Sequence, residues 1–247
     1  MTLSVLMPVY NESATIREIV GRVRTAPYRK QIIIVDDGSR DGTRDILRDE
    51  FENTDGLTVL YHDQNRGKGA AIRTAIPHAV GQVTIIQDGD LEYDPNDFPL
   101  LVEIIRAGYS DVVYGSRYLS EKNSLPLTKF KIGVVTLNCM VRILFGQPMT
   151  DEATCYKAFR TELLQDLHLV CERFEFCPEV TAKCIRRGHR IIEVPIRYNH
   201  RTVEEGKKIG WRDGLEAVWT LLRWRLFPES AASARPHRLP VAENPSR

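Results

Sequence analysis

One segment of this sequence, QDGDLEYDP at positions 87–95, carries four carboxylates, those of Asp88, Asp90, Glu92 and Asp94. So much negative charge in one place requires a nearby counter-charge. Carboxylate oxygens are hard ligands that suit Mg²⁺ or Mn²⁺, and such a metal keeps several waters and takes further ligands from substrate phosphates. The segment therefore indicates a metal site that binds a diphosphate. The alternative is an acidic loop in which Asp94 or Asn96 caps a helix that begins near residues 95–98.

Short apolar runs that alternate with helical stretches must position these carboxylates. Five runs have the length and composition of buried strands: residues 3–7, 31–35, 57–61, 83–86 and 111–114. An amphipathic helix is expected from about Ala14 to Ala26, capped by Ser13. A second helix follows the glycine loop at 65–71 and runs to about Ala79. Strands that alternate with helices predict an α/β fold with a parallel sheet and right-handed crossovers.

Charged side chains recur where these strands end. They are Glu12, Asp36, Asp37, Lys68, Asp88, Asp90 and Arg117. Ligands of such sheets bind outside the carboxyl ends of the strands, so these residues are expected to gather at one edge. Ordinary structural roles are the alternative, with Asp36 or Asp37 as a turn residue and Lys68 as a solvated cation at a helix start. Arg117 would then be a surface ion-pair partner. The recurrence at successive strand ends favours a shared site.

Familiar nucleotide and hydrolase motifs are missing. The loop at Gly67-Lys68-Gly69 lacks the first glycine and the Ser/Thr of a Walker-type phosphate loop, and no G-x-G-x-x-G follows the first strand. The chain also has no G-x-S-x-G elbow and no H-E-x-x-H pair, so hydrolase and zinc-protease interpretations lose their usual signals.

Six motifs follow one another along the chain. They are PVYNE at 8–12, DDGSRDGT at 36–43, QDGDLE at 87–92, GSRY at 115–118, TDEATCYK at 150–157 and a basic segment at 201–210. In this order they resemble the family-2 glycosyltransferases, most closely the dolichyl- and polyprenyl-phosphate sugar transferases, over roughly residues 2–225. The resemblance implies an A-type glycosyltransferase fold, with a mostly parallel nucleotide-binding sheet flanked by helices in a single catalytic domain at 1–227. It also implies a nucleotide-sugar donor, a divalent metal and inversion at the anomeric carbon.

The resemblance assigns residues to the donor site. Those expected to bind the nucleotide sugar are Pro8, Tyr10, Glu12, Asp37, Lys68, Asp88, Arg201 and Lys207. Those expected to ligate the metal are Asp88, Asp90 and Glu92. The common D-A-D of the family is D-G-D here, and Gly89 loosens the turn without removing a ligand.

The same resemblance assigns Arg117 to the acceptor phosphate, with Lys129 and Lys131 nearby. Relatives often have an arginine where this chain has these lysines, so only point-charge attraction is expected there. Asp151 falls near the acceptor as base or positioner, and a phosphate that is already ionised needs positioning more than proton removal. The expected catalytic residues are thus Asp90, Asp151 and Arg117.

The later part of the chain leaves several interpretations open. It contains a basic run, formed by Arg197, Arg201, Lys207 and Lys208. This run is either a flap that closes on the donor diphosphate or a solvated loop. The apolar helix at 130–146 either packs into the core or lies in a membrane interface, because it is too short to span a bilayer. A last helix at 211–227 has the composition of an interfacial helix, with anchors at Trp219, Trp224, Leu222, Phe227, Arg223 and Arg225. The tail at 228–247 is expected to be disordered.

Composition agrees with one catalytic domain. A chain of 247 residues with 43% hydrophobic content can bury one sizeable core. A formal net charge of +1 argues against a nucleic-acid partner bound by a broad basic surface. The five cysteines form no C-x-x-C pair, which suits reduced thiols in a cytosol, and no signal-peptide pattern is present. We therefore expect a cytoplasmic protein, peripheral on the cytosolic membrane face.

The activity that the resemblance implies is a metal-dependent, inverting sugar transfer with Mg²⁺ or Mn²⁺ as cofactor. The donor would be a nucleotide sugar of the GDP-mannose or UDP-glucose type, and the acceptor a polyprenyl or dolichyl phosphate. One alternative keeps the fold and the donor but has a soluble small-molecule or polysaccharide acceptor. Another is a non-catalytic protein that binds nucleotide sugars, and the retained pair Asp88 and Asp90 argues against it.

Overall fold

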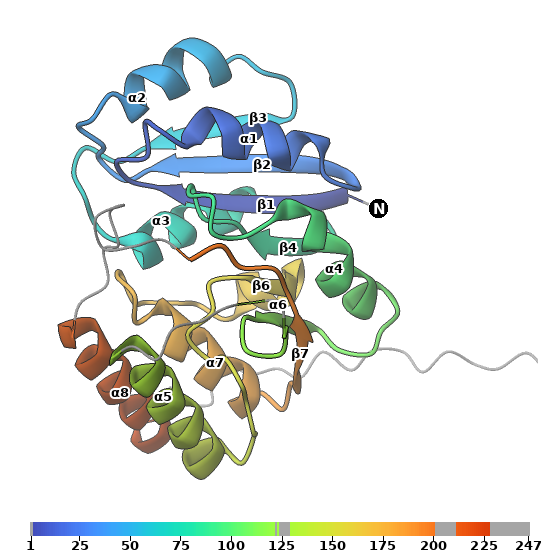
Figure 1. Ribbon diagram of the computed structural model, residues 1–247, viewed down its shortest axis with the longest axis vertical. Helices are drawn as coiled ribbons and strands as arrows, with labels where there is room; N and C mark the ends of the chain where they lie inside the picture. The colour runs from blue at the N-terminus through green and yellow to red at the C-terminus, as the bar shows by residue number, and fades with distance from the viewer. Residues whose placement is uncertain (1, 122, 124–128, 201–210, 228–247) are drawn as a thin grey trace, which may run out of the picture.

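A seven-stranded sheet forms the centre of the molecule. The computed structural model describes residues 2–121, 123, 129–200 and 211–227 (Figure 1). Its strands are β1 (Thr2–Val9), β2 (Arg29–Asp36), β3 (Leu57–Tyr61), β4 (Val83–Ile86), β5 (Val112–Ser116), β6 (Lys157–Arg160) and β7 (Ile191–Pro195). Their order across the sheet is β3-β2-β1-β4-β6-β5-β7. The sequence predicted five of these strands in the first half of the chain, and all five are present.

The sheet is mostly parallel, as predicted. β1 pairs in parallel with β2 and β4, β2 with β3, and β5 with β7. β6 is antiparallel to both β4 and β5, so β5 points the same way as β4. β6 was not predicted from the sequence, because this strand has only four residues and a lysine and an arginine at its ends. The carboxyl ends of β1, β2, β4 and β5 therefore share one edge of the sheet.

Helices cover both faces of the sheet in one α/β domain (Figure 1). On one face α1 (Ile16–Thr25) and α4 (Phe98–Arg106) belong to one hydrophobic cluster. The cluster on the other face includes residues of α3 (Lys68–Ala75), α5 (Lys129–Phe145), α6 (Thr161–Asp166), α7 (Phe176–Arg186) and α8 (Trp211–Leu226). Shorter helical segments are α2 (Thr43–Ile46), η1 (Leu47–Phe51), η2 (Ile76–His78) and η3 (Pro95–Asp97).

The first helix illustrates how the sequence pattern produces this packing. Ile16, Ile19, Val20 and Val23 recur at helical spacing and are fully buried. Each such side chain contributes about 1.5–3 kcal/mol when it leaves water. The predicted cap at Ser13 was wrong, because the carbonyl of Glu12 first closes a turn and α1 begins only after Thr15.

The helices α5 and α8 pack side by side at one end of the molecule (Figure 1). Part of each helix is buried, including Val141 of α5 and Leu221 of α8. Trp224 is only 4% exposed, so its prediction as a membrane anchor was wrong. Its ring lies in the core with the ammonium group of Lys183 4.1 Å from the ring centroid. The reason is helical spacing, since Trp224 follows Leu221 on the buried side of α8.

None of the helices in the described ranges combines the length and the apolar character that crossing a bilayer requires. The predicted tail at 228–247 and the central part of the predicted basic flap, 201–210, lie outside the residues that the structure describes.

Candidate active site

The loop after β1 is fixed against the loop after β2. Two backbone N–H groups of the first motif donate to side chains of the second: Asn11 to Ser39 Oγ at 2.9 Å, and Glu12 to Thr43 Oγ1 at 2.8 Å. Pro8, Tyr10 and Glu12 are half-buried at the end of β1. The structure thus joins the PVYNE and DDGSRDGT motifs into one wall, as the strand order requires.

Asp37 holds the glycine loop in place. This carboxylate is 2% exposed and accepts hydrogen bonds from the backbone N–H groups of Arg66 at 2.9 Å and Gly67 at 2.8 Å. His62 Nδ1 lies 2.7 Å from the same carboxylate. The nucleoside role expected for Asp37 stays a prediction, because its described contacts are to the protein's own loop. His62 was not predicted from the sequence, since a lone histidine after a strand carries no motif.

Asp36 is buried as well and serves the turn that follows β2. It accepts from the backbone N–H of Ser39 at 3.2 Å and from Arg44 Nε at 2.7 Å. This agrees with the turn interpretation that the sequence left open for this residue.

Lys68 begins α3 and forms an ion pair with Asp88 at the end of β4. The two side chains are 13% and 15% exposed, so the interpretation of Lys68 as a solvated cation was wrong. Burial lowers the pKa of Lys68, but the charge of Asp88, the charges of Cys155 and Cys177 and the hydrogen bond to Asp88 together raise this pKa overall. Gly69 allows this arrangement, because a Cβ on it would lie 2.7 Å from the carbonyl oxygen of Cys171.

The segment between Asp88 and Asp94 forms a tight turn. Asp90 Oδ1 accepts from the backbone N–H of Glu92 at 3.0 Å, and the carbonyl of Gly89 accepts from Thr15 Oγ1 at 2.9 Å. Asp94 Oδ1 accepts from the backbone N–H of Asn96 at 2.9 Å. Asp94 therefore caps the helical segment η3, as the alternative interpretation of this carboxylate predicted.

The three predicted metal ligands, Asp88, Asp90 and Glu92, do not converge as one metal-binding cluster among the described residues. The reason is that Asp88 turns to Lys68 while Asp90 accepts from the backbone of the turn. Carboxylate oxygens nevertheless have the hardness that Mg²⁺ or Mn²⁺ requires. Mg²⁺ is commonly bound by one or two carboxylates, with substrate phosphates and waters completing its ligands. The donor set at this edge fits such a metal.

Arg117, which follows β5, forms a buried bidentate pair with Asp151. Nε lies 2.8 Å from Oδ2 and Nη2 lies 2.7 Å from Oδ1, and the backbone N–H of Arg117 donates to Oδ2 at 2.9 Å. Asp151 is fully buried, and its backbone N–H donates to Glu193 at 2.8 Å. Arg117 is thus an ion-pair partner, but a buried one rather than the surface partner considered from the sequence.

The remaining cations are only partly described. Lys129 begins α5, and Lys131 is half-buried two residues later. Arg201 and Lys207 lie outside the described residues. Arg197, also predicted in the flap, is instead held by Asp97, with Nη2 2.7 Å from Oδ1, and by Asp94, with Nη1 at 3.0 Å from Oδ2. This part of the flap prediction was wrong, because two carboxylates near η3 bind the guanidinium.

A buried polar cluster behind the site was not foreseen. Lys157 Nζ donates to the backbone carbonyl of Glu152 at 2.8 Å and lies 3.4 Å from the ring centroid of Tyr114. The Thr181 hydroxyl donates to Glu152 Oε1 at 3.2 Å. Burial raises the pKa of Glu152 to about 7. Both charged residues belong to the TDEATCYK motif, and charged residues are usually exposed, so their burial had no signal in the sequence.

Comparisons with known proteins agree with this fold. The model of glycosyl transferase family 2 matches residues 4–167. An undecaprenyl-phosphate mannosyltransferase of Micrococcus luteus is 29% identical over 234 residues, which are 92% of this chain and 95% of that protein. A polyprenol monophosphomannose synthase of Mycolicibacterium smegmatis is 30% identical over 230 residues, which are 89% of this chain and 85% of that protein.

Among solved structures, a glucosyl-3-phosphoglycerate synthase of Mycobacterium tuberculosis has a TM-score of 0.69 at 20% identity, and the match covers 93% of this chain and 80% of that one. That crystal structure is a complex with Mn²⁺, uridine diphosphate and phosphoglyceric acid. Its likeness concerns the fold, which confirms the predicted A-type glycosyltransferase architecture. The match over residues 4–167, together with acidic strand ends gathered at one edge of a mostly parallel sheet, shows that this chain is a glycosyltransferase and belongs to glycosyl transferase family 2.

Proposed function

We propose that this glycosyltransferase transfers a sugar, with inversion, from a nucleotide-sugar donor to a polyprenyl phosphate in a metal-dependent reaction. The observation that carries the proposal is the ion pair of Lys68 with Asp88, followed two residues later by Asp90 in the turn, at the carboxyl edge of the sheet. Two carboxylates and a cation at the end of a central strand suit a diphosphate and its metal. The donor is of the GDP-mannose or UDP-glucose type.

Asp90 would ligate Mg²⁺ or Mn²⁺, with Asp88 and Glu92 supporting it. When bound, the metal supplies positive charge for the departing diphosphate. Lys68 adds a fixed cation beside Asp88. Pro8, Tyr10 and Glu12 form the wall next to the nucleoside, and Asp37 orients the glycine loop that carries Lys68.

Calorimetry with GDP-mannose and UDP-glucose tests this assignment. In Mn²⁺ we expect saturable binding of one donor, which a chelator abolishes because a diphosphate beside carboxylates is repelled without a cation. Asp90→Asn should abolish it as well. Asp94→Asn is the matched control, because it removes the same charge four residues away while asparagine still caps η3. Donor affinity that survives both the chelator and Asp90→Asn would overturn the proposed metal site.

The acceptor assignment is supported by relatives named for undecaprenyl-phosphate and polyprenol substrates. Arg117 is fixed by Asp151 at the end of β5, and Lys129 and Lys131 follow at the start of α5. These cations would meet the acceptor phosphate. The phosphate oxygen is already anionic at neutral pH, so Asp151 would position Arg117 rather than remove a proton.

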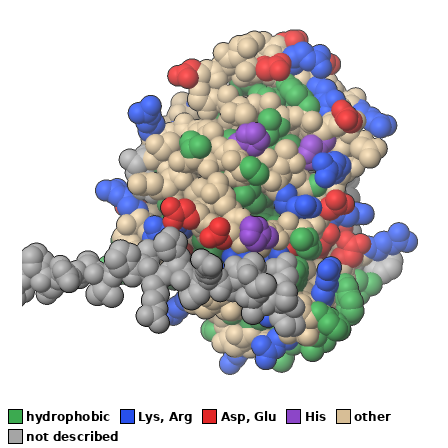
Figure 2. All heavy atoms as spheres, turned by 180° about the vertical axis from the view of Figure 1, so that it is seen from behind, with side chains coloured by type: hydrophobic (Ala, Val, Ile, Leu, Met, Phe, Trp, Pro, Cys, Tyr) green, Lys and Arg blue, Asp and Glu red, His purple; other side chains and the backbone are tan. Residues whose placement is uncertain are grey.

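A lipid acceptor also requires access to a membrane, since each buried methylene is worth about 0.8 kcal/mol and the long chain does not leave the bilayer readily. The helices α5 and α8 expose a set of large apolar side chains: Ile132, Val135, Ile143, Leu215, Trp219 and Leu226, with Phe227 directly after α8. Figure 2 shows hydrophobic side chains gathered at the lower right, at the end of the molecule where Figure 1 has these helices. We propose that this surface lies in the interface of the cytosolic membrane leaflet.

Liposome flotation tests the membrane proposal. The protein should float with anionic vesicles that contain polyprenyl phosphate. Binding should weaken with salt, because the exposed side chains of Arg223 and Arg225 would attract anionic headgroups. Trp219→Ser combined with Phe227→Ser should reduce flotation, whereas Tyr109→Ser should not, since Tyr109 is 79% exposed but follows α4 on the other face of the sheet. A protein that stays soluble with these vesicles would favour the soluble-acceptor transferase, whose fold counterpart is the phosphoglycerate complex.

A further inference from the structure

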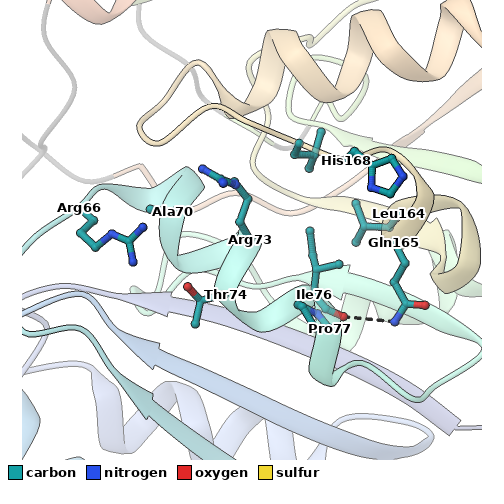
Figure 3. A pocket seen from close by; sticks show the side chains of 10 residues that line it. Arg66, Ala70, Arg73, Thr74, Ile76, Pro77, Leu164, Gln165 and His168 are labelled. Atoms are coloured by element: carbon teal, nitrogen blue, oxygen red, sulfur yellow. Dashed lines mark hydrogen bonds between the residues drawn. The ribbon is translucent and has the colours of Figure 1, made fainter. Parts of the chain in front are cut away.

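A cavity lies away from the residues assigned above. It has a volume of about 270 Å³ and opens between the α3 to η2 segment and α6 with the loop that follows α6 (Figure 3). Its polar lining comes from Arg66, Arg73, Thr74, Gln165 and His168. No side chain assigned to the donor, the metal or the acceptor contributes to it.

The lining has the charge of an anion site. Arg66 and Arg73 contribute two guanidinium groups and His168 an imidazole, and none of the ten lining residues is acidic. Arg73 Nη1 donates to the backbone carbonyl of Val170 at 2.9 Å, so this arginine reaches across to the opposite wall. Gln165 Nε2 donates to the carbonyl of Ile76 at 3.3 Å and joins the same two walls at another point (Figure 3). Arg73 and Gln165 thus each connect the two walls of the cavity.

Size and geometry limit the ligand. Sites for drug-sized molecules measure about 300–1,000 Å³, and this cavity is slightly smaller. Guanidinium groups bind phosphate oxygens in a bidentate manner, so phosphate oxygens complement Arg66 and Arg73, while His168 adds an imidazole at the other end of the cavity (Figure 3). Inorganic phosphate, diphosphate or a three-carbon phosphate ester are anions of the appropriate size.

A chain of hydrogen bonds joins this cavity to the donor site. Thr74 Oγ1 in the cavity wall lies 2.9 Å from His62 Nε2, and His62 Nδ1 lies 2.7 Å from Asp37 Oδ1. Asp37 in turn accepts from the backbone of Arg66, whose own side chain lines the cavity. Both routes end in the loop just before Lys68, the partner of Asp88. An anion that orders Arg66 would therefore order the loop that presents Lys68.

We propose that the cavity between α3 and α6 binds a small phosphate-bearing anion and that its occupancy stabilises the glycine loop of the donor site. Because coupling between two binding sites is reciprocal, donor binding would strengthen anion binding by the same factor. The binding test needs no transferase activity, so it stands apart from the function proposed above.

Calorimetry on the full chain in chelator, with inorganic phosphate, diphosphate and glycerol phosphate as separate probes, tests binding. We expect saturable binding of at least one of them, and a tenfold loss of affinity in Arg73→Gln. His168→Asn should weaken binding too without straining the backbone, because His168 has a φ of 47° and asparagine tolerates this conformation. The matched control is Arg24→Gln, which removes an exposed arginine from α1 on the opposite face and should bind normally. No saturable binding by wild type, or equal affinity in Arg73→Gln, overturns the site.

Hydrogen exchange tests the link to the donor site. The bound probe should slow exchange of the backbone N–H groups of Arg66 and Gly67 several-fold in wild type. It should have no such effect in Arg73→Gln at the same concentration. Protection confined to other regions, or equal protection in both proteins, would refute the coupling. The choice among the three probes distinguishes free phosphate from a phosphorylated metabolite, since only the latter would gain affinity from its carbon chain.

Discussion

The buried pair of Arg117 and Asp151 offers the sharpest test of the structural interpretation. In Arg117→Met the arginine stem is replaced by an apolar chain and the guanidinium is lost. Asp151 is fully buried and receives both side-chain hydrogen bonds of Arg117, at 2.7 and 2.8 Å. Without these two bonds the Asp151 carboxylate stays buried. Residue 117 then donates to it only through its backbone N–H.

Removing one partner of a buried pair costs about 3–5 kcal/mol, because the other charge stays desolvated. We therefore expect Arg117→Met to lose about this much unfolding free energy. An exposed pair provides the contrast: Arg106 and Glu103 lie 3.2 Å apart with side chains 59% and 49% exposed. Breaking such a surface pair costs about 0–1 kcal/mol, so Arg106→Met is the matched control. Arg117→Met combined with Asp151→Leu should recover at least half of the loss, since no charge is then left unpaired.

Urea unfolding followed by circular dichroism measures these differences, provided that the slopes of the transitions agree. A loss of less than about 1 kcal/mol in Arg117→Met, or no recovery in the double variant, would refute the idea that Asp151 depends on Arg117. The result also decides how activity data are interpreted. Loss of transfer in an Arg117 variant reports on acceptor binding only if the variant is folded under the assay conditions.

Two further predictions concern buried groups near the site. Burial raises the pKa of Glu152 from 4.5 to about 7, so its stabilising protonated form is present at low pH and is lost as pH rises through 7. Between pH 5 and 8 the unfolding free energy of wild type should therefore fall by up to about 3 kcal/mol more than that of Glu152→Gln. Urea unfolding at both pH values measures this difference. The same pH dependence in both proteins would contradict the prediction. Gly38 and Gly108 both have positive φ, +76° and +77°, but only at Gly38 would a Cβ meet backbone, 2.5 Å from the carbonyl carbon of Gln64. Gly108→Ala carries the strain of positive φ alone. Thermal unfolding should therefore show that Gly38→Ala is less stable than Gly108→Ala by at least about 1 kcal/mol, and equal losses of stability would refute the predicted clash.

Local patterns in the sequence were sufficient for the first five strands of the sheet and for the edge where the proposed site lies. β3 and β4 begin and end where their apolar runs do, at Leu57–Tyr61 and Val83–Ile86. This works because burial on both faces requires a continuous apolar run, which is a property of neighbouring residues. Strand direction follows from the alternation with helices, and direction decides at which edge Asp37, Asp88 and Arg117 lie.

Some local patterns had two outcomes that only packing separates. Trp219 and Trp224 are both tryptophans in the same helix, yet the first is 60% exposed and the second 4%. Their sequence context is similar, and the difference arises because α7 and α5 cover one side of α8. β6 is a related case, since its four residues become a strand through pairing with β4 and β5 on both sides.

The sequence by itself determined the residue types of the site, its place at the strand ends and the family. The tertiary structure alone decided which charges pair: Lys68 with Asp88 across 20 positions, and Arg117 with Asp151 across 34. It also formed the cavity that Arg66, Arg73 and His168 line from segments about 100 residues apart. The physical reason is that a periodic pattern specifies a face or a strand end, whereas an ion pair depends on distance in space, and that distance is set only when the strands have been ordered and the helices packed.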